Sequence, residues 1–185
     1  EIETYRILAL LALPLAREAT TGISESARRL ATITGQMSDI EGLEDERDML
    51  GELTALAVRM EMLVSQTAYR FSAAQAYYAL VETRIAELRE ERIEGLQTIR
   101  EFMDRRLAPA IRTCRTTALR QERLAERIAR ATAMLRARVD IALEEQNRDL
   151  LRSMNRRAKL QLRLQQTVEG LSVAAISYYL VGLVN

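Results

Sequence analysis

The chain has 185 residues, enough for one domain with a sizeable hydrophobic core. Its 27 basic and 26 acidic residues leave a formal net charge of +1, so the composition gives no reason to expect nucleic acid as a partner. Histidine is absent and Cys114 is the single cysteine, which excludes disulfides within the chain and metal sites of the usual His/Cys kind. No cofactor motif is present, and a lone cysteine suits a reducing compartment.

The composition predicts an all-α fold. Only seven glycines and two prolines interrupt the chain, and alanine, leucine, glutamate and arginine dominate it. Apolar residues recur at spacings of three and four, which is typical of long helices. We therefore predict a long antiparallel helical hairpin or coiled-coil bundle, with a long stalk helix that runs into a membrane segment.

A first helix is expected from about residue 2 to about residue 35. Pro14 should kink or restart it, because proline removes one helical hydrogen bond, and Gly35 is a plausible stop. The chain begins at Glu1 in the middle of this pattern, without a cap, so we expect it to be a fragment of a longer protein.

A polar turn is expected at residues 36–48, and it carries six acidic residues against one cation, Arg47. We call the six acidic residues the acidic tip: Asp39, Glu41, Glu44, Asp45, Glu46 and Asp48. The simplest interpretation is a solvated loop whose acids also stabilise the N-terminus of the next helix. The alternative is a charge-sensitive switch or a place where a divalent cation binds.

The second helix has the clearest pattern in the chain. Its apolar residues follow alternating steps of three and four, which is a heptad seam. The seam residues are Leu50, Leu53, Ala57, Met60, Val64, Thr67, Phe71, Ala74, Tyr78, Val81, Ile85 and Leu88. We expect them to form the core.

A break is expected near residues 92–97, where Gly95 weakens the helix. Thr98 and Glu101 then have the spacing of a capping box, so the third helix should begin near Ile99, and Pro109 should bend it. Its seam then continues without a break to about residue 168. The seam residues are Leu107, Ile111, Cys114, Ala118, Gln121, Ala125, Ile128, Thr132, Leu135, Val139 and Ala142.

Three seam residues of the third helix carry extra information. Polar Gln121 and Thr132 indicate either a device that sets the register or a wetter interface shared with another subunit. We interpret Cys114 as a small buried hydrophobic residue in preference to a reactive thiol.

The last residues of the chain change character. No charged residue follows Glu169, and this uncharged stretch of about 15 residues is shorter than the roughly 20 needed to span a bilayer. A buried core helix would explain it, and so would a membrane segment that continues past Asn185. Within it, Tyr178, Tyr179 and Gly182 are candidates for a pore mouth, or simply interfacial tyrosines and a close-packed glycine.

A group of basic residues precedes the uncharged stretch and favours the membrane interpretation. We call this group the basic collar: Arg148, Arg152, Arg156, Arg157, Lys159 and Arg163. Such a group is expected on the cytoplasmic side of a membrane, although a solvated helix face would look similar. We predict a cytoplasmic bundle and stalk over residues 1–168 and the start of a transmembrane segment over residues 169–185. In an antiparallel hairpin, Glu46 would lie level with about residue 145, which places the acidic tip beside the collar.

Several strings along the chain resemble a known family. They are EIETYR at 1–6, ALLALPLARE at 9–18, YRFS at 69–72, IAELREERI at 85–93, RRLAPA at 105–110 and QLRLQQTVEGLS at 161–172. With them the chain resembles an uncharacterised bacterial family described as predicted membrane-anchored proteins (domain of unknown function 3422). The resemblance covers essentially the whole chain. It implies a preceding cytoplasmic domain, a membrane segment that continues past Asn185, and no assigned activity.

A second resemblance is architectural. Two antiparallel helices with an acidic tip, followed by a long stalk with a basic collar, look like the CorA magnesium channel group. The signature Gly-Met-Asn of that group is replaced here by GLVN at residues 182–185, which puts ion selectivity of that type in doubt.

From these observations we expect a non-enzymatic, membrane-anchored helical protein of the bacterial inner membrane, with its helical domain in the cytoplasm. Its expected partners are the lipid bilayer and further copies of itself through the stalk, with a divalent cation as a further candidate. A CorA-like cation channel subunit is the alternative function.

Overall fold

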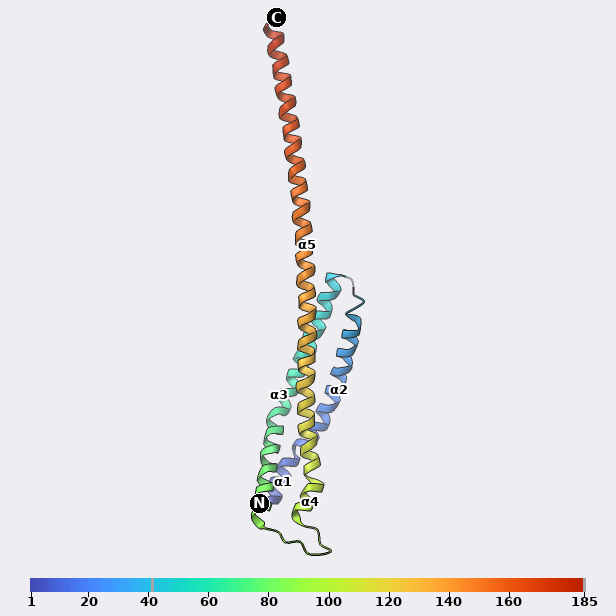
Figure 1. Cartoon of the computed structure of the whole chain (residues 1–185), viewed down its shortest axis with the longest axis vertical. Coiled ribbons are helices and arrows are strands. Elements are labelled where there is room, and N and C mark those ends of the chain that lie inside the picture. The colour runs from blue at the N-terminus through green and yellow to red at the C-terminus, as the bar shows by residue number, and fades with distance from the viewer. Residues whose placement is uncertain (41, 185) are drawn as a thin grey trace. The chain divides into compact units, whose positions relative to one another are not determined.

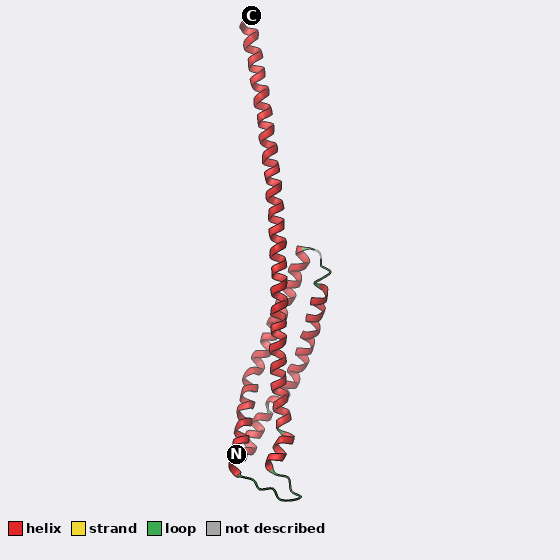
Figure 2. Ribbon diagram, viewed as in Figure 1, coloured by secondary structure: helices red, strands yellow, loops and turns green. Residues whose placement is uncertain are grey.

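The computed structural model describes the backbone of residues 1–40 and 42–184, and the side chains of residues 1–40 and 42–163. Within this part of the chain all regular structure is helical, which confirms the predicted all-α fold (Figure 2). The helices are α1 (Ile2–Leu10), α2 (Ala12–Gln36), α3 (Leu43–Leu88), α4 (Ile99–Arg106) and α5 (Ala108–Val184).

The chain divides into two compact units, Glu1–Ala137 and Arg138–Asn185. The first unit contains α1 to α4 and the beginning of α5, and the second contains the rest of α5. This division at residue 137 reflects how the helices pack. The boundary that we predict at residue 168 is a different one, because it separates a cytoplasmic part from a membrane part, and it stays a prediction.

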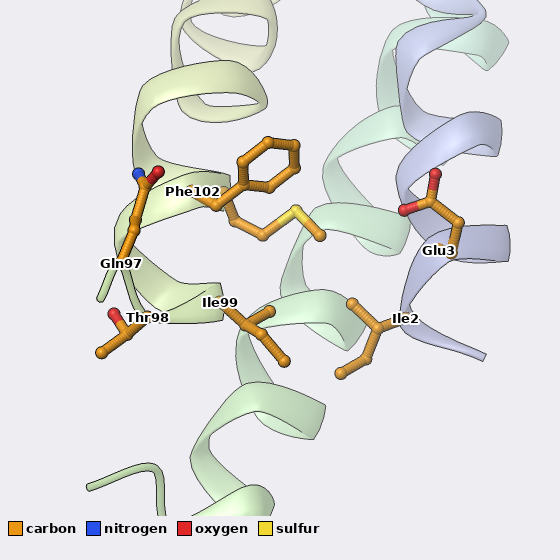
Figure 3. A pocket seen from close by; sticks show the side chains of 7 residues that line it. Ile2, Glu3, Gln97, Thr98, Ile99 and Phe102 are labelled. Atoms are coloured by element: carbon orange, nitrogen blue, oxygen red, sulfur yellow. The ribbon is translucent and has the colours of Figure 1, made fainter. Parts of the chain in front are cut away.

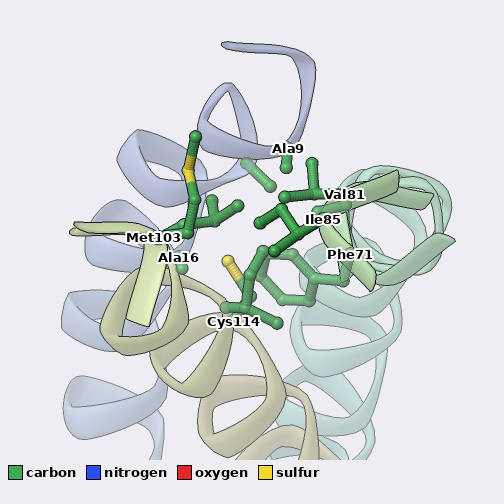
Figure 4. Close-up of a cluster of buried hydrophobic side chains, with 11 residues drawn as sticks. Ala9, Ala16, Phe71, Val81, Ile85, Met103 and Cys114 are labelled. Carbon is green, nitrogen blue, oxygen red and sulfur yellow. The ribbon is translucent and has the colours of Figure 1, made fainter. Parts of the chain in front are cut away.

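In the first unit, α1 and α2 lie along one long helix, α3, which runs in the opposite direction (Figure 1). The beginning of α5 lies beside them, so three long helical rods share one core. The core has two clusters of buried side chains. The cluster around α1 and α4 consists of Ala9, Ala12, Ala16, Phe71, Ala74, Val81, Ile85, Met103, Leu107, Ile111 and Cys114 (Figure 4). The cluster around α2 consists of Ile23, Leu30, Ile33, Met49, Leu53, Leu56, Met60, Leu124, Ile128, Ala131 and Leu135.

The predicted first helix is divided in two at Leu11, whose backbone stays right-handed at φ −62° and ψ −18°. Pro14 is the third residue of α2, a position where the missing N–H has no helical partner to lose. The expected restart at Pro14 is therefore confirmed. Helix α2 ends at Gln36, one residue after the predicted stop at Gly35.

The predicted polar turn is shorter than expected, because α3 already begins at Leu43. Glu44, Asp45 and Glu46 occupy its first turn, where carboxylates interact favourably with the free N–H groups of the helix end. The turn prediction is therefore wrong for residues 43–48, and the predicted stabilising role of these acids fits their position.

Most of the predicted seam of α3 is buried or half-buried. The exceptions are Ala57 and Leu88, which are exposed, whereas Leu56 is buried. Helix α3 packs against α2 as well as α5, so its buried surface is wider than a single heptad seam and includes Leu56. Leu88 is the last residue of α3 and lies beyond the core.

The predicted start of the third helix is confirmed in detail. The backbone N–H of Glu101 donates to Thr98 Oγ1 at 3.1 Å, and the N–H of Thr98 donates to the Glu101 carboxylate at 3.4 Å. Glu90 adds a second cap, since its carboxylate accepts from the backbone N–H of Ile99 at 2.7 Å and of Arg100 at 3.0 Å. The expected bend at Pro109 is a break at Leu107, which separates α4 from α5.

The predicted seam of α5 is buried at Leu107, Ile111, Cys114, Gln121, Ile128, Leu135 and Val139. The other predicted positions, Ala118, Ala125, Thr132 and Ala142, are half-buried. Gln121 answers one question that the sequence left open. Its amide donates to Thr67 Oγ1 at 3.1 Å and to the Leu63 carbonyl at 3.2 Å, so this polar seam residue sets the register of α5 against α3 within one chain.

Candidate functional site

The acidic tip occupies two local structures. Asp39 lies in the turn after α2, whereas Glu44, Asp45 and Asp48 are exposed on the first turns of α3. Glu46 is buried, with 6% of its surface exposed, although its charge predicted a solvated position. Glu41 lies outside the described residues. The described members of the tip are therefore mostly fixed on a helix and do not form one long loop.

Three members of the tip line a common groove of about 460 Å³ in the first unit, together with a fourth carboxylate that sequence reasoning missed. Asp39, Asp45 and Asp48 are joined there by Glu52, one helical turn after Asp48. The Glu52 carboxylate accepts a hydrogen bond from Arg29 of α2 at 2.7 Å. The i, i+4 spacing of Asp48 and Glu52 was the sequence signal that could have identified it.

These carboxylates do not converge as metal ligands do. Among the side chains that the structure describes, no group of three or more His, Cys, Asp or Glu residues is close enough to hold an ion. A divalent cation as a partner of the tip therefore stays a prediction.

The basic collar lies in the second unit, and all six of its side chains are exposed on α5. Arg148 contacts Glu144 at 2.6 Å and Arg152 contacts Asp149 at 3.3 Å, both within one turn of the helix. Exposed pairs of this kind contribute little stability. The interpretation as a solvated face with local pairs fits the structure, and the role of the collar at a membrane surface stays a prediction.

The predicted proximity of tip and collar involves the two separate units, and it stays a prediction. Tyr178, Tyr179 and Gly182 belong to the backbone of α5, and their side chains lie outside the described residues.

A second pocket, which sequence reasoning missed, lies between the beginning of α1 and the beginning of α4 (Figure 3). It has a volume of about 440 Å³ and is lined by Ile2, Glu3, Gln97, Thr98, Ile99, Phe102 and Met103. A hydrogen bond from Arg6 lowers the pKa of the Glu3 carboxyl, and the Thr98 hydroxyl is engaged in the helix cap. The lining is therefore mainly apolar; the Glu3 and Thr98 side chains are engaged by neighbouring residues, and the Gln97 amide is its third polar group.

Cys114 is the remaining group with intrinsic reactivity. It is 1% exposed among apolar side chains of the first cluster (Figure 4). Burial raises the pKa of its thiol, which keeps the sulfur protonated and unreactive.

One stretch of the described side chains, Ile2–Gln36, is long and apolar enough to cross a membrane by length and composition alone. Core helices and signal sequences meet the same criterion, so this is weak evidence for a span. The uncharged stretch after Glu169 lies outside the described side chains.

Comparison with known proteins gives one family. No match was found among curated proteins, and none among solved structures. The family described as "Protein of unknown function (DUF3422)" matches residues 1–185, the entire chain, and the chain therefore belongs to it.

Proposed function

We propose that this chain is a non-enzymatic, membrane-anchored helical protein of the bacterial inner membrane, whose helical domain lies in the cytoplasm and which forms homo-oligomers through α5. One observation carries the proposal. Helix α5 is continuous from Ala108 to Val184, so the exposed basic collar and the uncharged stretch after Glu169 belong to one helix.

The order of charges along α5 supports insertion of its C-terminal end into the membrane, with the basic collar on the cytoplasmic side. Residues 148–163 contain six basic residues and one acid, Asp149, and residues 170–185 contain no charge. Each basic residue near an anionic cytoplasmic leaflet contributes about 1 kcal/mol to the binding of the helix at the membrane surface. The following residues carry no charge that would oppose entry into hydrocarbon.

The competing membrane candidate, Ile2–Gln36, is better explained as a core helix. Its buried apolar residues recur at spacings of three, four or seven on one face: Ala9, Ala12, Ala16, Ala19, Ile23, Leu30 and Ile33. Six of these seven belong to the two core clusters of the first unit. If α1 and α2 moved into a bilayer, the apolar faces of α3 and α5 that pack against them would be exposed.

The absence of enzymatic activity is proposed from the chemistry of the groups present. A catalytic site needs a nucleophile, a base and a group that stabilises developing charge, all in one pocket. The chain contains no histidine, and its single cysteine is buried and protonated. A CorA-like channel subunit stays the alternative prediction; the described part of the acidic tip contains no group of three or more potential metal ligands that could hold an ion.

Alkaline carbonate extraction of bacterial membranes tests the anchor. The whole chain should stay in the membrane pellet. A variant with Ile176→Arg and Leu180→Arg should be released, because each arginine in the centre of a membrane helix costs about 2.5–3.5 kcal/mol.

The first helix offers a matched control. Ile7 and Leu11 are each 51% exposed, so Ile7→Arg with Leu11→Arg leaves the core intact. We expect this variant to stay in the pellet. Release of this control with retention of the α5 variant would contradict the proposal and assign the anchor to Ile2–Gln36.

A further inference from the structure

Beyond Leu143, the described side chains of the second unit are exposed on every side of α5. Every residue from 147 to 163 is exposed. Leu150, Leu151, Met154 and Leu162 are each more than half exposed, at 54%, 66%, 65% and 59%. Most of the stability of a protein helix comes from packing of its apolar face, so side chains of this size indicate a surface that another molecule covers.

The apolar and basic side chains of this segment lie on different faces of the helix. At about 100° per residue, Leu150, Leu151, Met154, Ala158 and Leu162 fall within about 120° of the circumference. We call these five residues the apolar stripe. Five of the six collar residues fall within another sector of about 80°, roughly opposite to it. We call these five residues the basic stripe: Arg148, Arg152, Arg156, Lys159 and Arg163. The sixth collar residue, Arg157, lies about 20° beyond Leu150, at the edge of the apolar stripe.

Two amide side chains lie on the same side of the helix as the apolar stripe. Asn147 and Gln161 project from the same sector of the helix, one near each end of the stripe. A lipid surface would bury both amides without partners, which is costly. A second copy of the same helix, parallel and in register, would place each amide opposite its own counterpart, an arrangement by which helix pairs fix their register.

We propose that the apolar stripe of α5 is the contact surface between two or more copies of this chain, arranged parallel and in register. The parallel direction rests on the proposed function, because copies anchored in one membrane by the same helix end run in the same direction. In this arrangement the basic stripes point away from the contact, so their like charges do not oppose association, and Arg157 lies at the edge of the contact. The exposed positive face stays available to solvent or anionic headgroups.

An antiparallel pair centred on Met154 is the arrangement that must be separated from the proposed one. It would bring Asn147 of one copy to Gln161 of the other, and Leu150 to Ala158. Parallel copies instead bring each residue to its own counterpart. Cysteine pairs at two levels of the helix distinguish these possibilities, because a disulfide requires Cβ atoms about 3.5–4.5 Å apart.

The experiment is disulfide trapping in the whole chain. Single variants Leu150→Cys and Ala158→Cys probe the apolar stripe at two levels, and Arg152→Cys probes the basic stripe. The unaltered chain is the background control, since its one cysteine, Cys114, is buried. Membranes from cells that produce each variant are oxidised with copper phenanthroline and analysed without reducing agent.

We expect covalent dimers from Leu150→Cys and from Ala158→Cys, and at least about tenfold less from Arg152→Cys. Dimers only when the Leu150→Cys and Ala158→Cys variants are produced together would show an antiparallel pair and overturn the proposal. Equal yields on both stripes, or no dimer at either stripe position, would also overturn it. The proposal would also be overturned by a monomeric chain in which lipid protects the cysteines of the apolar stripe from reaction with maleimide.

A matched pair of polar variants provides a second measurement. Leu150→Gln with Met154→Gln should lower the yield of dimers trapped at Ala158→Cys by about tenfold, since two apolar side chains leave the contact. Leu160 is 60% exposed but lies outside the apolar stripe, so Leu160→Gln should leave the yield unchanged. Equal loss in both variants would contradict the assignment of the surface.

Carbonate extraction of the same membranes separates this inference from the proposed function. A chain that is extracted but still forms dimers at both stripe positions would refute the anchor and keep the contact surface. A chain that resists extraction but forms no dimers would keep the anchor and refute the surface.

Discussion

The buried pair of Thr67 on α3 and Gln121 on α5 allows a prediction in which two similar substitutions change the free energy of unfolding by unequal amounts. Thr67 and Gln121 are each 3% exposed. The Gln121 amide donates to Thr67 Oγ1 at 3.1 Å and to the Leu63 carbonyl at 3.2 Å, and the Thr67 hydroxyl itself donates to the Leu63 carbonyl at 2.9 Å. The two side chains therefore depend on each other unequally.

Thr67→Val should be the damaging change. It removes the acceptor of one Gln121 N–H group, on a side chain that is only 3% exposed. A buried donor without a partner costs about 1–3 kcal/mol. Against a typical total stability of about 5–15 kcal/mol, a loss of this size is easily measured.

Gln121→Leu should change the stability by less than about 1 kcal/mol. The Thr67 hydroxyl keeps the Leu63 carbonyl as its partner, so no buried polar group is left alone. The lost hydrogen bonds are offset by the burial of an apolar side chain of similar size. In the double variant the cost of Thr67→Val should largely disappear, which gives a coupling energy of about 1–3 kcal/mol.

Urea unfolding of the whole chain, followed by far-ultraviolet circular dichroism, measures all four free energies of unfolding. The reasoning is refuted if Gln121→Leu costs more than Thr67→Val, or if the two effects are simply additive. Additivity would mean that the two side chains do not interact in solution.

Two further predictions concern the first unit. Gly51 lies within α3, where alanine is a better helix former than glycine, and an added Cβ would meet no neighbouring atom within 4 Å. Gly51→Ala should therefore raise the free energy of unfolding by about 0.5–1 kcal/mol. Gly95→Ala should lower it by about 1 kcal/mol, because Gly95 has φ +82°, and equal effects in urea unfolding would contradict this contrast. Burial raises the pKa of Cys114 above its usual 9.0, so the unfolded thiol ionises first as the pH rises. The stability difference between the chain and its Cys114→Ala variant should therefore be constant well below pH 9, where the thiol is protonated in both states, and shift against the chain as the pH rises through 9. A difference independent of pH would be inconsistent with a buried thiol.

Features that depend on neighbouring residues in the sequence could be predicted closely. The start of α4 at Ile99 follows from the spacing of Thr98 and Glu101, and both hydrogen bonds of the capping box are present. The restart of the first helix near Pro14 follows from the chemistry of one residue. Such rules act within one helical turn and do not depend on the tertiary fold.

Features that depend on which helices cover which faces could not be predicted. The choice of Leu56 over Ala57 requires knowledge that α3 packs against two helices at that level. The burial of Glu46 contradicts its charge, and the pocket beneath Phe102 joins residues about 100 positions apart. The groove lined by Asp39, Asp45, Asp48 and Glu52 likewise depends on how α2 ends beside α3, because Asp39 follows α2 and the other three lie on α3.

Gln121 also shows why the apolar stripe calls for a second chain. Among the described side chains of α5, three amides lie among apolar neighbours along the buried or apolar face: Gln121, Asn147 and Gln161. Within the first unit, Gln121 is satisfied by α3, and this pairing fixes the register of two helices. Asn147 and Gln161 are exposed, and the described part of the second unit offers them no opposing helix. If the same physical rule holds along the whole of α5, their partners lie on another copy, and the helix that completes the bundle at its beginning forms the oligomer contact further along.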